Sequence, residues 1–86
     1  MTMQADEIER LIAEALPDCT VAVEGSDGHF TATVVGERFA GQLPVARQKA
    51  VYATVTEQIT SGAIHALTIR AQTPQEWEKA QKLRIG

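Results

Sequence analysis

Residues 61–77 are SGAIHALTIRAQTPQEW, and this stretch combines the end of one helix, a strand and the start of a second helix. Ser61-Gly62 predicts the helix end, because glycine tolerates the left-handed conformation common just past a helix C-terminus. The alternating pattern from Ile64 to Ala71 predicts a strand, and one of its faces holds His65, Leu67 and Ile69. Thr73-Pro74-Gln75-Glu76 predicts the next helix, with an N-cap threonine, proline at the first helical position and a glutamate that closes a capping box.

The residues before this stretch predict a helix followed by a β-hairpin. Apolar residues recur at the spacing of one helical stripe, namely Ile8, Leu11, Ile12, Ala15 and Leu16, and Pro17 ends the helix. The first strand is expected from Cys19 to Glu24, with Cys19, Val21 and Val23 on one face. Gly25-Ser26-Asp27-Gly28 is typical of a turn. The second strand starts at His29, and its inner face is formed by Phe30, Ala32 and Val34.

The connection between the second and third strands determines the topology. A helix is predicted from Val45 to Thr60, and its apolar side consists of Val51, Tyr52, Val55 and Ile59. Helical crossovers join parallel strands, so we expect the third strand to run parallel to the second. The element order is then α, β, β, α, β, α, which indicates a single α+β domain over residues 1–86.

Length and composition exclude several classes of function. The 86 residues have room for one small core and no second lobe, which argues against a self-sufficient enzyme with a small-molecule substrate. The net charge of −3 provides no global attraction to nucleic acid or to an anionic bilayer. One cysteine allows no internal disulfide, and no apolar stretch approaches the roughly 20 residues that span a membrane. Residues 1–9 are acidic and do not resemble a secretory leader, so we expect a cytoplasmic protein without a membrane partner.

The two histidines are the candidate metal ligands. Parallel strands begin at the same end of a sheet, so His29 and His65 are expected at one edge, where two neutral imidazoles could share a metal. An alternative for His65 is a half-buried histidine bonded to a backbone carbonyl, because it has the core-facing parity of Leu67 and Ile69. An alternative for His29 is a solvated strand residue. Cys19 lies at the far end of the hairpin, where a role in packing is favoured over ligation.

Other side chains provide weaker signals. Trp77 and Tyr52 lie at helical spacing from apolar neighbours, which favours packing in the core over stacking on a ligand. Arg38, Arg47 and Lys49 form a modest basic group around the crossover, and solvated helix faces explain them. The sequence contains no serine-histidine-acid order, phosphate-binding glycine loop or CxxC spacing. We therefore predict no catalytic residues.

The chain resembles the BolA-like family over nearly its whole length. The most specific segments are Phe39-Ala40-Gly41, Arg47-Gln48 to Val51-Tyr52, and Ile64-His65-Ala66 leading to Thr73-Pro74-Gln75-Glu76-Trp77. The resemblance implies a fold similar to the type II KH domain, with a three-stranded mixed sheet and helices packed against it. It also implies a monothiol glutaredoxin as partner.

In that family the two partners bind a bridging two-iron two-sulfur cluster, and none is expected in the isolated protein. The invariant ligand histidine of the family falls on His65. The second ligand comes from the loop between the first two strands, which here offers only His29, while the glutaredoxin cysteine and glutathione hold the other iron. The roles implied are iron-sulfur trafficking or the regulation of iron and stress responses.

Nucleic-acid binding is the alternative function, since relatives are also described as transcriptional regulators. Arg38, Arg47 and Lys49 would have to contact the DNA. The Gly-x-x-Gly loop by which KH domains clamp a nucleic-acid backbone has no match between the helices, and the overall charge is acidic. We therefore rank this function second.

Overall fold

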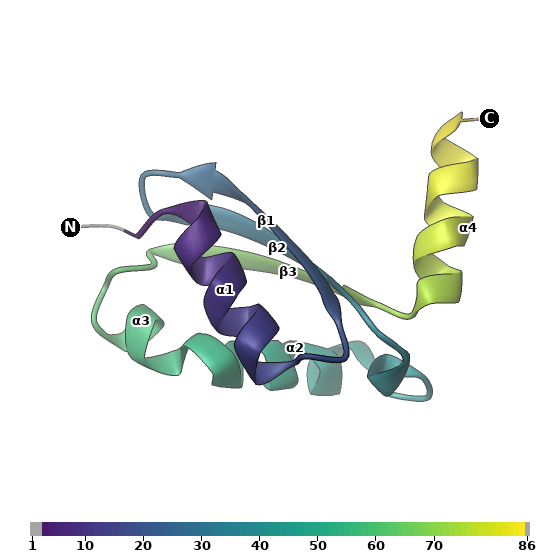
Figure 1. The fold of residues 1–86 in the computed structure, drawn as a ribbon, viewed down its shortest axis with the longest axis horizontal. Helices are drawn as coiled ribbons and strands as arrows, with labels where there is room; N and C mark the ends of the chain where they lie inside the picture. The colour runs from purple at the N-terminus through teal and green to yellow at the C-terminus, as the bar shows by residue number, and fades with distance from the viewer. Residues whose placement is uncertain (1–2, 86) are drawn as a thin grey trace.

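The computed structural model describes residues 3–85, so residues 1, 2 and 86 of the predicted domain lie outside it (Figure 1). Its strands are β1 (Thr20–Ser26), β2 (His29–Val35) and β3 (Ala66–Gln72). The helices are α1 (Ala5–Ala15), α2 (Pro44–Tyr52), α3 (Thr56–Thr60) and α4 (Pro74–Ile85), and two 3₁₀ turns are η1 (Glu37–Phe39) and η2 (Ala53–Val55). The predicted α+β class is confirmed.

The three strands form a mixed sheet in the order β1-β2-β3. β1 and β2 are antiparallel, whereas β2 and β3 are parallel, as the crossover predicted. His29 pairs with Ala66 and Val35 pairs with Gln72, so β2 and β3 begin at the same end of the sheet. The more specific likeness to a KH domain stays a prediction.

The crossover differs from the single helix expected between Val45 and Thr60. It consists of α2, η2 and α3, and the helix is interrupted at Val55, which has φ −131° and ψ 24°. Two threonines beside the break bond to the backbone: the Thr54 hydroxyl donates to the Val51 carbonyl at 2.7 Å and the Thr56 hydroxyl to the Tyr52 carbonyl at 3.1 Å. Such local bonds and β-branched side chains compete with a regular helix, which explains the break.

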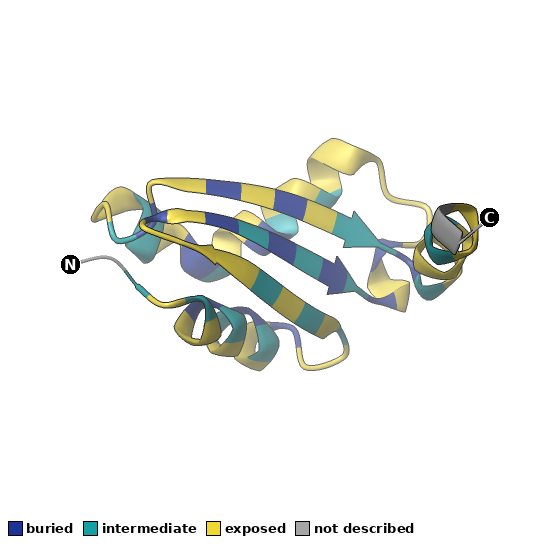
Figure 2. Cartoon of the chain, turned by 90° about the horizontal axis from the view of Figure 1, so that it is seen from above, coloured by how far each residue is buried: buried dark blue, intermediate teal, exposed yellow. Residues whose placement is uncertain are grey.

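One face of the sheet and the helices α1 to α3 enclose the core. Figure 1 shows these helices together, while α4 stands away from them at the other end of the sheet. The fully buried side chains include Ile8 and Ile12 from α1, Val34 from β2, and Val51 and Val55 from the crossover. The inward residues of β2 are buried and alternate with half-buried ones, and Leu67 and Ile69 of β3 are buried between exposed ones, as predicted (Figure 2). No helix within residues 3–85 is long and apolar enough to cross a membrane.

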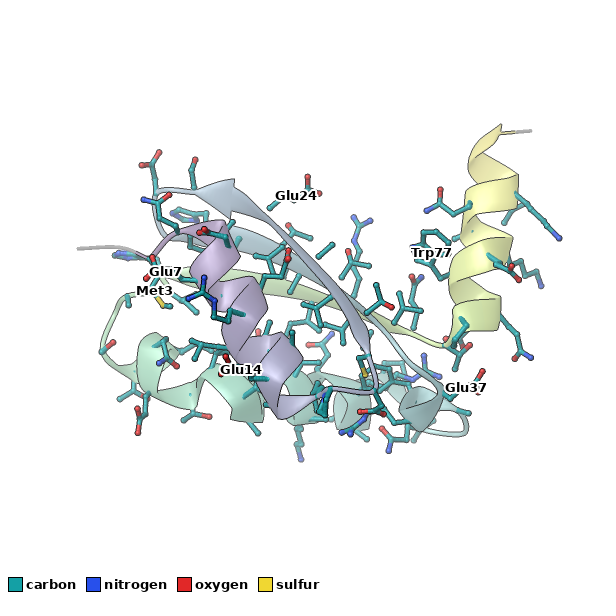
Figure 3. All side chains as sticks on the ribbon, in the orientation of Figure 1. Met3, Glu7, Glu14, Glu24, Glu37 and Trp77 are labelled. Atoms are coloured by element: carbon teal, nitrogen blue, oxygen red, sulfur yellow. The ribbon has the colours of Figure 1, made fainter. Side chains whose placement is uncertain are left out.

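Two aromatic side chains lie outside the buried core, so the expectation of core packing was wrong for both. Tyr52 is 37% exposed, and its hydroxyl donates to the Leu67 carbonyl at 3.0 Å. Trp77 is 39% exposed and points from α4 toward the sheet (Figure 3). It lines a shallow cavity with Thr33 and Val35, on the face opposite the core, because α4 leaves the end of β3 without packing beside the other helices.

Candidate functional site

A tight hairpin turn positions His29. Asp27 and Gly28 have φ values of +55° and +82°, as required for a two-residue turn with both central residues in the left-handed region. Ser26 pairs with His29 across this turn. The predicted turn was too long, since Gly25 and Ser26 belong to β1. His29 is consequently the first residue of β2, and its side chain is exposed.

His65 lies directly before β3 and is exposed. Its N–H donates to the Gly28 carbonyl at 2.8 Å, and the N–H of Ala66 donates to the same oxygen at 2.9 Å. Consecutive residues of a regular strand alternate in direction, so this shared acceptor shows that the alternation starts only at Ala66. The expected core-facing position of His65 beside Leu67 was therefore wrong, as was the interpretation of a half-buried imidazole.

The two imidazoles lie next to each other, as the parallel topology predicted. Their ring centroids are 6.3 Å apart and their planes differ by 15°. Within residues 3–83, no side-chain hydrogen bond involves either ring. A ring nitrogen binds a metal in the plane of the ring, so one of these nearly parallel rings must turn before both nitrogens can face one tetrahedral ion.

Among the residues that the structure describes, this end of the sheet, the histidine edge, offers two metal-binding side chains, His29 and His65. The part of the chain that the structure describes contains no group of three or more His, Cys, Asp or Glu residues that could hold a metal. Cys19 precedes the opposite end of β1, where Thr20 pairs with Val35, and it packs in part against the core. Burial, followed by the charge of Asp18, raises the pKa of its thiol, which favours the protonated form. Among the described residues, no third side chain of these types joins the two histidines, which suits a site that a partner molecule completes.

The uncovered face of the sheet has a shallow depression beside His29. It has a volume of about 410 Å³ and is lined by residues of all three strands: Glu24, Gly25, His29, Phe30, Thr31, Ala66 and Thr68. His29 therefore borders a surface that a partner molecule could contact, in addition to standing beside His65.

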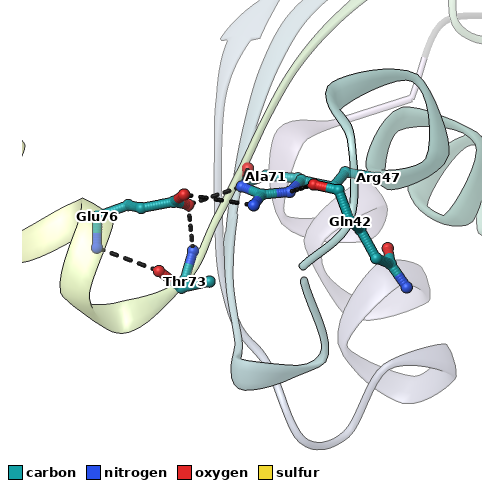
Figure 4. Close-up of polar contacts among 5 residues, drawn as sticks. All are labelled: Gln42, Arg47, Ala71, Thr73 and Glu76. Atoms are coloured by element: carbon teal, nitrogen blue, oxygen red, sulfur yellow. Dashed lines mark hydrogen bonds and ion pairs between the residues drawn. The ribbon is translucent and has the colours of Figure 1, made fainter. Parts of the chain in front are cut away.

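Two of the three basic residues proposed for DNA contacts are held in ion pairs. Arg38 binds Asp18 through two hydrogen bonds of 2.9 and 2.7 Å, and this contact lowers the pKa of the Asp18 carboxyl. Arg47 pairs with Glu76 at 2.6 Å and also donates to the carbonyls of Ala71 and Gln42 (Figure 4). Lys49 is exposed on α2. Arg47 is thus engaged within the chain, which disfavours it as a phosphate ligand, whereas Arg38 would have to exchange an exposed and weak pair with Asp18 for a phosphate.

The predicted capping box at the start of α4 is confirmed. The Glu76 N–H donates to the Thr73 hydroxyl at 3.2 Å, and the Thr73 N–H donates to the Glu76 carboxylate at 2.9 Å. Arg47 completes this cluster with a side chain only 14% exposed. Sequence reasoning missed this role, because Arg47 lies 29 residues before Glu76 and no local pattern connects the two.

Comparison with known proteins agrees with this architecture. The family model described as BolA-like protein matches residues 7–76. The chain is 40% identical over 81 residues to the Acid stress protein IbaG of Escherichia coli K12, covering 94% of this chain and 96% of the relative. It is 49% identical over 55 residues to the DNA-binding transcriptional regulator BolA of Vibrio cholerae, covering 64% of this chain and 51% of that protein.

A solved structure supports the same assignment. The structure of a BolA protein homologue from Coxiella burnetii superposes with a TM-score of 0.78 at 34% sequence identity, covering 90% of this chain and 99% of that one. The α+β arrangement with a three-stranded mixed sheet is therefore that of a solved BolA homologue. The relatives named above are a stress protein and a transcriptional regulator. The sequence match, the fold and the matched relatives together establish that the chain belongs to the BolA-like family.

Proposed function

We propose that this protein is a non-enzymatic partner of a monothiol glutaredoxin and that the two proteins hold a two-iron two-sulfur cluster between them. The observation on which the proposal rests is the pair of exposed imidazoles, with centroids 6.3 Å apart at one edge of the sheet. His65 is the proposed principal ligand and His29 the second. The cellular role would be iron-sulfur trafficking or the regulation of iron and stress responses.

The number of donors supports a shared cluster. A two-iron two-sulfur cluster takes four ligands from its surroundings, and the described residues of the histidine edge provide two. The glutaredoxin cysteine and glutathione would supply the others. Imidazole in place of thiolate raises the reduction potential of such a cluster and makes its binding sensitive to protons, since only neutral imidazole binds the metal.

The residues of this chain would present and orient the ligands. The main chain of His65 is fixed by its hydrogen bond to the Gly28 carbonyl, while its side chain is exposed. His29 is held by strand pairing and borders the depression on the open face of the sheet. Neither role requires a general base or a nucleophile.

The direct test is to mix the protein with a cluster-loaded monothiol glutaredoxin and record visible absorption and circular dichroism. We expect the wild type to change both spectra and His65→Ala to abolish the change. His29→Ala should leave a complex whose cluster is lost more rapidly. Gln75→Ala, at an exposed position of α4, is the control and should behave as wild type.

Thermal melts must first show that each variant is folded. A His65→Ala protein that is folded and gives the wild-type spectra would refute ligation by His65. An unchanged cluster lifetime in His29→Ala would remove His29 from the site.

Nucleic-acid binding remains the second candidate, because the relative from Vibrio cholerae is named a DNA-binding transcriptional regulator. The ion pair of Arg47 argues against it, and Arg38 and Lys49 alone would contribute little. Phosphate contacts predict that the binding constant falls by about one logarithmic unit per tenfold increase in salt for each contact. A titration with duplex DNA at several salt concentrations tests this function, and absent binding or a flat response would exclude phosphate-mediated binding.

A further inference from the structure

Gly28 lies directly against the ring of His65. A Cβ atom added to Gly28 would be 2.2 Å from Cδ2 of His65, 2.8 Å from Cγ and 3.2 Å from Cβ. The first two distances are far shorter than van der Waals contact between carbon atoms. The imidazole therefore occupies space that is available only because residue 28 has no side chain.

Two other glycines show that backbone conformation alone does not explain this contact. Gly41 and Gly62 have φ values of +78° and +85°, close to the +82° of Gly28. A Cβ atom at either of them would meet nothing within 4 Å. Glycine relieves backbone strain at all three positions, whereas only Gly28 among them also makes room for a histidine ring.

The same residue fixes the main chain on both sides of the site. The Gly28 carbonyl accepts hydrogen bonds from His65 and Ala66, and His29 follows Gly28 directly. Gly28 is itself buried, so its Cα forms a floor under the imidazole. The backbone of His65 and the space for its ring are thus set by one turn residue.

We propose that Gly28 is a positioning residue that seats the His65 imidazole in one orientation before any partner binds. This proposal rests on the proposed function. In it, His65 is the ligand whose orientation is set in advance, and His29 is the ligand that turns to complete the site. A ligand held in its bound orientation loses less conformational freedom on binding than a freely rotating one. A side chain at residue 28 would displace the ring and weaken ligation without removing a donor atom.

The first test uses the free protein and needs no glutaredoxin. NMR of the wild type should show a nuclear Overhauser contact between the Gly28 Hα atoms and the His65 ring, and three-bond couplings of a single χ1 rotamer. Gly28→Ala should lose this rotamer preference, while Gly41→Ala and Gly62→Ala should keep it. The proposal that Gly28 positions the His65 ring would be overturned if the wild-type ring averages over rotamers, or if Gly28→Ala keeps the wild-type rotamer.

The three alanine variants also allow a matched comparison of folding. Each places alanine at positive φ, which at about 1–2 kcal/mol corresponds to an unfolding equilibrium constant raised by roughly 5- to 30-fold. Denaturant titrations should show a cost of this order in Gly41→Ala and Gly62→Ala. Experiments are then carried out where all three variants are folded, so a loss seen only in Gly28→Ala is not a loss of structure.

The second test uses cluster-loaded monothiol glutaredoxin as the probe. We expect Gly28→Ala to lower the affinity and the circular dichroism change, and the two control variants to behave as wild type. If Gly28→Ala binds as well as the controls, the contact between Gly28 and the His65 ring does not contribute to ligation and the proposal is overturned. If the wild type shows no spectral change with cluster-loaded glutaredoxin while NMR shows the fixed rotamer, the proposed function fails, but the positioning of the His65 ring by Gly28 is confirmed.

Discussion

The two ends of β3 differ in how their polar side chains are satisfied. At the end where the strand begins, His29 and His65 are exposed, and no hydrogen bond among the side chains of residues 3–83 involves their rings. At the end where the strand stops, Glu76 bonds to both Arg47 and Thr73, and Arg47 also donates to the Ala71 carbonyl. The end with the two histidines has the chemistry of a binding site. The cluster of Arg47, Thr73 and Glu76 at the other end, here called the joint, has a structural role, although Arg47 was a functional candidate from the sequence.

Side chains also occupy backbone groups on the two outer strands of the sheet, β1 and β3. The Val23 N–H of β1 donates to the Glu9 carboxylate at 3.1 Å, and β3 carbonyls accept hydrogen bonds from Tyr52 and Arg47. Side chains that occupy strand edges in this way hinder unwanted pairing with other chains. At the histidine edge, by contrast, the imidazole nitrogens remain available as metal ligands, which suits contact with a partner.

Replacing Arg47 should have the largest effect on stability. Arg47→Ala removes a mostly buried guanidinium and leaves the Ala71 and Gln42 carbonyls without their charged donor. Hydrogen bonds to charged groups contribute about 1.5–3 kcal/mol, so we expect a loss of that order in urea denaturation. Lys49→Ala, on the exposed side of the same helix, is the control. Equal stability of the two variants would show that the joint contributes nothing.

The N-cap of α4 should have the next largest effect. Thr73 is buried, and its hydroxyl accepts the Glu76 N–H. Replacing an N-cap hydroxyl by alanine typically costs about 1 kcal/mol, so Thr73→Ala should lower the urea midpoint, while Thr73→Ser should retain most of the stability. If serine fails to restore stability, the hydroxyl is not the source of the effect.

Acid should weaken the joint through Glu76. The Arg47 contact, followed by the Thr73 N–H, lowers the pKa of Glu76 from 4.5 to about 2. Because the folded pKa lies below the unfolded one, this contribution is present above about pH 4.5 and is lost as the pH falls toward 2. Glu76 is exposed, so screening by water and salt reduces the effect.

The check is a set of urea midpoints between pH 6 and about pH 2. Glu76→Gln should flatten the acid dependence in part, and Asp18→Asn provides the comparison, since Arg38 lowers the pKa of Asp18 as well. An identical pH profile for wild type and Glu76→Gln would contradict the assignment.

The histidine edge should have the smallest effect on stability. His29→Ala and His65→Ala remove exposed side chains that make no hydrogen bond to another described side chain or to the described backbone, so each should change the free energy of unfolding by less than about 0.5 kcal/mol. Thermal melts of the free protein measure this change. A large destabilisation by either substitution would erase the contrast between the two ends of β3 and indicate a structural role for that imidazole.

Short-range patterns in the sequence determined most of the elements. Alternation predicted the inward faces of β1 and β2, the Thr73-Pro74 start predicted the cap of α4, and the crossover predicted the parallel pairing of β2 and β3. The strand faces and the helix cap depend on neighbours within a few residues, and the parallel pairing follows from the general rule that helical crossovers join parallel strands. The meeting of His29 and His65 at one edge followed from the parallel topology and needed no further information.

Only the tertiary structure decided how these elements meet. The Arg47 and Glu76 contact joins residues far apart in the sequence, the exposure of Trp77 depends on where α4 projects, and the fit of the His65 ring over Gly28 depends on the turn beside it. Each depends on how segments distant in the sequence are placed relative to one another, which the packing of the whole chain decides. Local conformational preferences cannot specify such arrangements, because no short-range or periodic sequence pattern connects the residues concerned.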